Sequence, residues 1–479
     1  MENTKFLIKK FTFILIATII FSFGCSKSKL DEKPLSFIGP DDFFNTPTQV
    51  EAAFAASMNF LWDRWYAYAY GIQDYKNDDQ LFDGDLNIPS NWGADKWNEH
   101  YTAIMNINAP IKALKTNKLV GVSQAEIDIL MGQAKFLRAF NYFMLVRMFG
   151  GVPLITEDTP DPTSTEIIRS SIVDVYQLII SDFTEAIVKL PAIWPEEKRG
   201  RPTSDAAKGL LAKVYLTMAT YPLHDASYYQ KAADLAKQVI DGGRYSLVPD
   251  INNVFSFATK YGPEMMWSFN TNEQDRTTSV QVWSSMEGWG DLAVDPLWVQ
   301  GYPDQPRKDA YVETVSRVTG ESYITLGVNP GEKKFQYDAQ AQWDGVTSFI
   351  NMPIIRFADV LLIFAEADNM AHGSPTQAAV DAINKVIDRA NGYAINSQHP
   401  LTSISMSVEA FDTAVIQERN WELCFELGDR WFDLIRKHMV KQVNRVSVQQ
   451  NFTEDDYLFP IPEKEIRLNP LITQNPGYN

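Results

Sequence analysis

Apolar residues recur every three or four positions along most of the chain beyond residue 40, and this spacing predicts helices. One such run covers 172–190 and ends at Pro191, a residue that cannot continue a helix. Two more runs cover 206–218, where Ser204 is the predicted N-cap, and 229–240, which ends before two glycines. The pattern therefore predicts a helical protein and not a sheet.

The predicted helices come in pairs with small residues at their contact positions. Alanines are frequent on the apolar faces of 206–218 and 229–240, and a similar pair covers 360–365 and 379–390. Pairs of this size look like tetratricopeptide units, although no strict period of about 34 residues is present. We predict a mainly α fold: tetratricopeptide-like helix pairs form a scaffold, and a long irregular part rich in loops is attached to it.

Two stretches interrupt the helical pattern and hold most of the large aromatic residues. They cover about 60–101 and 261–350, and turn-forming residues are spread through both. Long non-periodic segments in a compact protein tend to be functional or disordered, and aromatic content argues against disorder. We expect both stretches to be loop insertions in a single domain that covers 41–479.

The N-terminal segment has the pattern of an export signal. Lys9 and Lys10 precede the thirteen mostly apolar residues Phe11–Phe23, and Gly24-Cys25 follow. Thirteen residues are too few to span a bilayer core, which needs about 20. We predict a lipoprotein signal peptide at 1–24, with Cys25 as the acylated, palmitate-bearing N-terminus and 25–40 as lipid anchor and tether. An incidental Cys25 is the alternative, since Ser22-Phe23 depart from the usual flank of such a site.

Composition and charge exclude several classes of protein. The chain is 45% apolar and 13% aromatic, which is typical of a folded globular protein. Its formal net charge of −17 makes it a poor binder of polyanions, so we expect no nucleic acid partner. The 2 cysteines, Cys25 and Cys424, provide neither an intramolecular disulfide framework nor a multi-thiolate metal site.

The common catalytic and cofactor motifs give no support for an enzyme. The sequence has no phosphate-binding loop, no HExxH zinc motif and no GxSxG elbow, and its 5 histidines lack ligand spacing. The segment 288–293 matches a dinucleotide fingerprint but follows no predicted strand. The segment 83–87 resembles the start of a calcium loop, yet Ile88 and Ala94 stand where that loop needs Gly and Glu. We therefore expect no metal, no cofactor and no catalytic residues.

The segment 418–434 mixes charged and apolar residues more than any other part of the chain. Glu418, Glu422 and Glu426 are spaced four apart, which places them on one face if a single helix covers them. Like charges at this spacing repel, so cations from other helices are needed. Arg138 and Arg356 lie in apolar surroundings and need such partners. We predict a structural ion-pair network here and not a pair of catalytic acids.

Several segments are similar to the motifs of one family. In chain order they are Leu30-Asp31-Glu32-Lys33-Pro34, 134–143 with 149–154, Gly200-Arg201-Pro202-Thr203, 355–362 with 365–367, 418–433, and 459–462 leading to 474–478. They follow the family order from residue 30 to residue 478. By these segments the chain resembles the SusD/RagB family of outer-membrane nutrient-binding lipoproteins.

The resemblance implies a protein that binds and does not catalyse. It implies tetratricopeptide-like helix pairs with an irregular ligand-binding part, a lipid anchor in the outer membrane and exposure at the cell surface. It further implies a SusC-like TonB-dependent transporter as partner. The protein would then act as a lid that captures an oligosaccharide or polysaccharide ligand for nutrient uptake.

The aromatic stretches supply the chemistry that a sugar site needs. A sugar ring presents apolar C–H faces and polar edges, so it requires flat aromatic platforms and a few polar groups. Trp97 is excluded as a platform, because it lies four residues before Tyr101 in a helical pattern. The residues that we expect to form the site are the platforms Trp92, Trp289, Trp298 and Tyr302 and the hydrogen-bonding partners Asp78, Asp79 and Asn91. Each tryptophan has packing in the core as its alternative role.

Two other functions stay open at this stage. A secreted helical glycoside hydrolase would have similar helices and aromatic loops, but needs two carboxylates about 5–10 Å apart across a cleft. A member of the same family that captures peptides would use backbone hydrogen bonds and side-chain pockets instead of stacking faces.

Overall fold

A computed structural model of the protein describes most of the chain beyond residue 42. The described residues are 43–64, 80–81, 90–116, 119–274, 277–278, 286, 288, 293–335, 347–397, 402–427, 429–442 and 452–478, with the side chains of 59–64, 80–81, 90–93 and 277–278 left out. The helices are α3 (Pro47–Arg64), α5 (Ser90–Lys115), α6 (Gln124–Phe149), α7 (Ile172–Lys189), α8 (Ser204–Met218), α9 (Ser227–Asp241), α11 (Pro296–Gly301), α12 (Pro306–Tyr311), α13 (Tyr323–Leu326), α14 (Phe357–His372), α15 (Gln377–Ala390), α16 (Val408–Glu422), α17 (Asp429–Arg436) and α19 (Glu463–Leu468).

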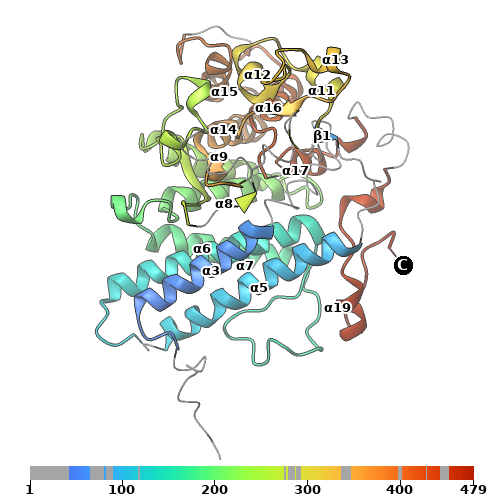
Figure 1. Cartoon of the computed structure of the whole chain (residues 1–479). Helices are drawn as coiled ribbons and strands as arrows, with labels where there is room; N and C mark the ends of the chain where they lie inside the picture. The colour runs from blue at the N-terminus through green and yellow to red at the C-terminus, as the bar shows by residue number, and fades with distance from the viewer. Residues whose placement is uncertain are drawn as a thin grey trace, which may run out of the picture.

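The long helices stack on one another in sequence order (Figure 1). α3 packs on α5, α5 on α6, α6 on α7, α7 on α8, and α8 on α9. α14 then packs on α9, although the whole segment 242–356 separates them in the chain, and α14 also contacts α15 and α16. The prediction of a mainly α scaffold of paired helices is confirmed.

Side-chain caps explain where several of these helices begin. The Ser171 hydroxyl accepts a hydrogen bond from the Asp174 backbone N–H at the start of α7. At α8 the N-cap is Thr203, one residue before the predicted Ser204, and its hydroxyl accepts from the Ala206 N–H. The Ser204 hydroxyl instead donates to the Ile187 carbonyl of α7. This bond ties together two helices that are neighbours in the stack.

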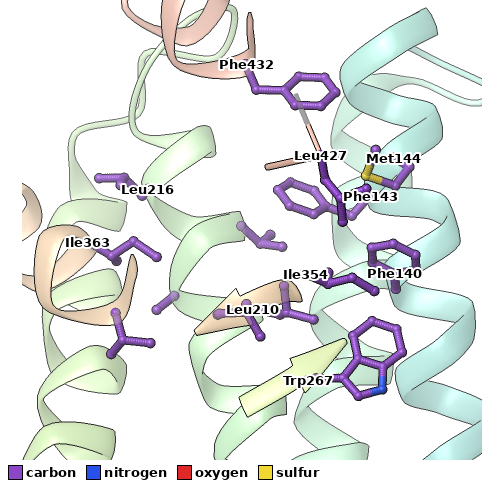
Figure 2. Packing of buried hydrophobic residues seen from close by; sticks show 14 of the residues in the cluster. Phe140, Phe143, Met144, Leu210, Leu216, Trp267, Ile354, Ile363, Leu427 and Phe432 are labelled. Carbon is purple, nitrogen blue, oxygen red and sulfur yellow. The ribbon is translucent and has the colours of Figure 1, made fainter. Parts of the chain in front are cut away.

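The centre of the core is α6, which is buried on nearly all sides. Figure 2 shows Phe140, Phe143 and Met144 of α6 facing side chains of α8 and of the strand pair beside it. The Trp267 ring contacts the Phe136 ring edge-to-face, with centroids 4.6 Å apart. A helix that is hydrophobic all round is expected in this central place.

The irregular part lies mainly between α9 and α14, and its described residues form four antiparallel strand pairs with one another and with β1. They are β1 (Gln80–Leu81) with β4 (Ala293–Val294), β2 (Met265–Phe269) with β8 (Met352–Arg356), β3 (Thr277–Thr278) with β7 (Thr347–Ser348), and β5 (Val312–Glu313) with β6 (Gly331–Glu332). The stretch predicted as irregular at 60–101 is partly helical, because α3 extends to Arg64 and α5 begins at Ser90. Among the described helices, none has both the length and the hydropathy that crossing a bilayer requires.

Candidate functional site

A short strand pair joins the two aromatic-rich stretches. Gln80 of β1 pairs with Val294 of β4, and Leu81 pairs with Ala293. Asp79 directly precedes β1 in the chain, and Trp289 lies four residues before β4. Segments more than 200 residues apart in sequence therefore meet at one place.

Half of the eight predicted site residues lie outside the described residues. Asp78, Asp79 and Trp289 do so, and so does Cys25, the predicted lipidation site. Asn91 and Trp92 fall in the first turn of α5, so their backbone is helical, whereas we predicted a loop insertion at about 60–101. The side chains of these two residues are not described.

Trp298 and Tyr302 are core residues and not platforms. Trp298 lies in α11 and Tyr302 directly follows that helix, and they are only 6% and 2% exposed. The Trp298 indole N–H donates to the Asn420 amide oxygen at 3.2 Å, and the Tyr302 hydroxyl donates to the Trp421 carbonyl at 2.9 Å. Burial raises the pKa of the Tyr302 hydroxyl well above its ordinary value. The prediction that both rings stack on a ligand is wrong, because α16 covers them. Trp97, which we excluded as a platform, is indeed buried in α5, at 3% exposed.

A buried ion-pair cluster fastens the irregular part to the scaffold. Arg307 of α12 and Arg356 of β8 both contact Glu422 of α16, at 2.8 Å and 2.7 Å. Arg389 of α15 contacts the same carboxylate at 2.6 Å and also bonds Glu264. Burial favours the neutral acid, but the surrounding cations dominate and hold the pKa of Glu422 well below its ordinary value.

The predicted structural network is therefore confirmed, with two differences. Glu426 is not on the same helix as Glu422, because α16 ends at Glu422 and the following turn has positive φ angles at Phe425 and Leu427. Glu426 still contacts Arg356, at 2.8 Å. Arg138 does not face this cluster, because it lies in α6 at another layer of the stack.

Arg138 has its own carboxylate partners. It contacts Asp182 of α7 at 2.7 Å and forms a short bond to Glu157, and the Asn108 amide oxygen accepts a third bond at 2.9 Å. Despite its burial, Glu157 has its pKa lowered to about 2, with Arg138 as the main favourable partner. Arg138 thus joins α5, α6 and α7.

Sequence reasoning missed several members of the central cluster. Glu264, Arg307, Lys334 and Arg389 come from four separate segments, and no local pattern marks them as partners. Lys334 contacts Glu426 and donates to the carbonyls of Glu422 and Cys424. The described residues contain no group of three or more His, Cys, Asp or Glu side chains arranged to hold a metal ion.

Sequence comparison agrees with this architecture. A family profile described as "Starch-binding associating with outer membrane" matches residues 45–216, and a SusD family profile matches residues 330–478. The chain is 29% identical to SusD-like protein P2 of Formosa agariphila, over 98% of this chain and 100% of that protein. This chain belongs to the SusD/RagB family.

The fold of this SusD/RagB protein is shared with solved structures. A SusD homologue from Bacteroides thetaiotaomicron has a TM-score of 0.82 at 22% identity, over 92% of this chain and 98% of that one. A laminarin-binding SusD-like protein has a TM-score of 0.71 at 22% identity, over 91% of this chain and 100% of that one. At this identity the likeness establishes the SusD fold.

Proposed function

We propose that this protein captures an oligosaccharide or polysaccharide at the outer membrane and delivers it to a SusC-like TonB-dependent transporter. The matched profile is described as starch-binding and associated with the outer membrane, and a protein of the same fold binds laminarin. The protein acts by binding and not by catalysis.

The observation that carries this proposal is the β1–β4 pair. It brings together two stretches that hold stacking rings and hydrogen-bonding groups, both of which a sugar site needs. In this proposal Trp92 and Trp289 are the stacking platforms, and Asp78, Asp79 and Asn91 bind the hydroxyl groups.

The scaffold supports the site by keeping its attachment points fixed. Trp298 and Tyr302 lock α11, which follows β4 directly, onto α16. Arg307 locks α12 onto the same helix through Glu418 and Glu422. A binding site on irregular segments gains precision when its ends are held by rigid elements.

The acidic side chains of the ion-pair clusters are not available to act as general acids. Glu418 and Glu422 are each paired with a buried arginine, and Asp182 is paired with Arg138. A general acid needs a carboxyl group within reach of the substrate. These three carboxylates are buried and paired with arginines, so they are not within reach of a substrate.

Location follows from the N-terminal segment in this proposal. Acylated Cys25 anchors the protein, and the tether to residue 40 leaves the domain free to cover the transporter. Labelling with a palmitate analogue tests this part, since Cys25→Ser removes the label if Cys25 is the acylated residue.

Native gels cast with a panel of polysaccharides test the capture itself, with each polysaccharide also checked for shortened products. We expect one or two of them to retard the protein without being shortened. Trp92→Ala and Trp289→Ala should then reduce the retardation. The control is Tyr393→Ala, which removes an aromatic ring that is 46% exposed and follows α15, and it should leave the retardation unchanged. Shortened products, or no retardation by any member of a broad panel, would contradict the proposal.

A further inference from the structure

A depression lies beside the start of α8. It has a volume of about 340 Å³ and is lined by residues from the α7–α8 connection, from the segment that follows α9 and from 260–268. A neighbouring depression of about 420 Å³ shares Arg199, Gly200 and Arg201 with it. Each volume is in the range of small-molecule sites, which begins at roughly 300 Å³. We call the first of these the basic depression.

Four cations line the basic depression, in a protein whose net charge is −17. Two of them are neutralised within the protein. Arg201 forms a bidentate pair with Glu51, and Arg244 contacts Asp205 at 2.5 Å. The other two, Arg199 and Lys260, are available to a ligand.

Lys260 has no carboxylate within ion-pair distance among the described residues. Its ammonium donates to the Thr271 carbonyl at 3.1 Å and lies 4.8 Å from the Phe257 ring centre and 5.3 Å from that of Tyr261. Burial lowers the pKa of Lys260, since no acid stabilises the charge. A half-buried cation without a counter-ion attracts an anion.

Arg199 is only loosely held. Its guanidinium is 3.6 Å from Glu196, and the two side chains are 51% and 83% exposed. Such surface pairs contribute little and are easily exchanged for another anion. Arg199 and Lys260 therefore provide a net positive charge at this place.

Aromatic rings lie beside these cations. Tyr261 is 38% exposed, and the Trp194 indole is fixed by its bond to the Pro202 carbonyl at 2.8 Å. Both line the basic depression, and Gly262 and Pro263 leave its edge free of long side chains. A flat ring next to an unneutralised cation suits a sugar ring that carries a charged group.

We propose that the basic depression binds an acidic sugar unit, whose carboxylate or sulfate group contacts Lys260 and Arg199 while its ring packs on Tyr261 or Trp194. The inference rests on the proposed glycan capture and specifies the ligand further: the captured glycan carries acidic units, and a second place on the protein holds one of them. The sites differ, because none of the residues lining the basic depression belongs to β1 or β4.

Saturation-transfer NMR with glucuronate, glucose 6-sulfate and glucose tests this inference on the purified protein. The three probes share a ring and differ in charge, so we expect one or both acids to bind and glucose not to bind. The acid that binds more strongly identifies carboxylate or sulfate as the recognised group. Equal binding of glucose would overturn the proposal.

A charge-matched pair of variants assigns the site. Arg199→Gln/Lys260→Gln should weaken acid binding at least about tenfold, because two charged contacts are lost. Lys441→Gln/Lys464→Gln makes the same change in net charge at exposed positions elsewhere, and should leave binding unchanged. Equal weakening by both pairs, or by neither, would overturn the assignment.

Two further measurements separate this inference from its alternatives. Tyr261→Ala should weaken the binding of glucuronate and leave the binding of inorganic sulfate unchanged. In a competition experiment, inorganic sulfate should displace the acidic sugars less well than they displace each other. If it displaces them equally well, the site recognises only an anion and the proposal is wrong. Trp92→Ala/Trp289→Ala should keep acid binding while it loses retardation by polysaccharide. If this double variant keeps retardation, the proposed platforms are wrong; if it loses acid binding as well, the basic depression is not a separate site.

Discussion

The guanidinium of Arg356 lies 2.7 Å from the carboxylate of Glu422, and both side chains are fully excluded from solvent. Arg356 ends β8, where the irregular part returns to the scaffold, and Glu422 ends α16. The pair thus connects the two parts of the protein in the buried interior. Because Arg307 and Arg389 contact the same carboxylate, one acid neutralises charge from three separate elements.

Glu422→Gln should therefore destabilise the fold strongly. The change leaves three buried guanidinium groups with a deficit of negative charge, and we expect a loss of roughly 3–5 kcal/mol in the free energy of unfolding. Urea denaturation followed by circular dichroism measures it. The control Glu196→Gln removes an acid that is 83% exposed and should leave the midpoint unchanged. A small loss for Glu422→Gln would mean that Glu264, Glu418 and Glu426 suffice to neutralise the arginines.

Trp298→Ala should lower stability, in contrast to the proposed platform variants. The Trp298 ring packs on Tyr302, Trp421 and Phe425, so its removal leaves a cavity that costs about 3–5 kcal/mol. Thermal melts and polysaccharide gels on the same samples check this. Trp92→Ala and Trp289→Ala should change the gels and leave the melting temperature unchanged. If the Trp298→Ala protein melts like the parent but is no longer retarded by polysaccharide, Trp298 contacts the ligand and the core assignment is wrong.

Asn475→Ala should release the C-terminal segment. The Asn475 amide donates to the carbonyls of Phe149 and Phe459, at 3.1 Å and 2.7 Å, and accepts from Arg169 at 2.7 Å. The substitution leaves these buried groups without partners, which costs about 1–3 kcal/mol. Faster cleavage near the C-terminus by a nonspecific protease reports the release. Gln230→Ala, on the exposed face of α9, is the matched control and should be cleaved like the parent.

The sequence pattern predicted those helices that have one apolar and one polar face. α7, α9 and α15 belong to this group, and their ends follow from proline, glycine and capping residues. Helix α6 gave no such signal, because its burial on nearly every side removes the periodicity. The spacing of apolar residues therefore predicts the outer helices better than the central helix α6.

Tertiary contacts decided what sequence reasoning missed at the site. Trp298 is followed by glycine and proline residues that are typical of exposed loops, yet α16 covers it. The charged spacing at 418–426 indicated a buried network, but its partners Arg307 and Arg389 come from distant segments whose pairing no local pattern encodes. The prediction of two irregular aromatic stretches was only partly right, because α3 and α5 extend into 60–101. The β1–β4 pair, which no local pattern predicted, shows that the two stretches meet.

Glu332 is a buried acid with no cation within ion-pair distance among the described residues. Its side chain is fully buried on β6, one oxygen accepts from the Phe335 N–H at 2.8 Å, and the other has no hydrogen-bond partner among the described residues. Burial raises the pKa of Glu332 to about 8, and the nearby acid Glu313 adds to the shift. The folded protein therefore keeps this group protonated at neutral pH.

Glu332→Gln should remove a pH dependence of stability. An acid whose pKa rises on folding stabilises the native state at low pH, and this contribution is lost as the pH rises from about 4.5 in the unfolded chain to about 8 in the folded one. We expect the variant to match the parent near pH 4.5 and to be more stable by about 4 kcal/mol at pH 8, because its neutral amide has no ionisation cost. Urea midpoints at a series of pH values measure the difference. Glu321→Gln, an exposed acid in the β5–β6 connection, should give a curve parallel to that of the parent. If the Glu332→Gln curve is also parallel, the Glu332 carboxyl is ionised in the folded protein and its charge is neutralised by Lys334.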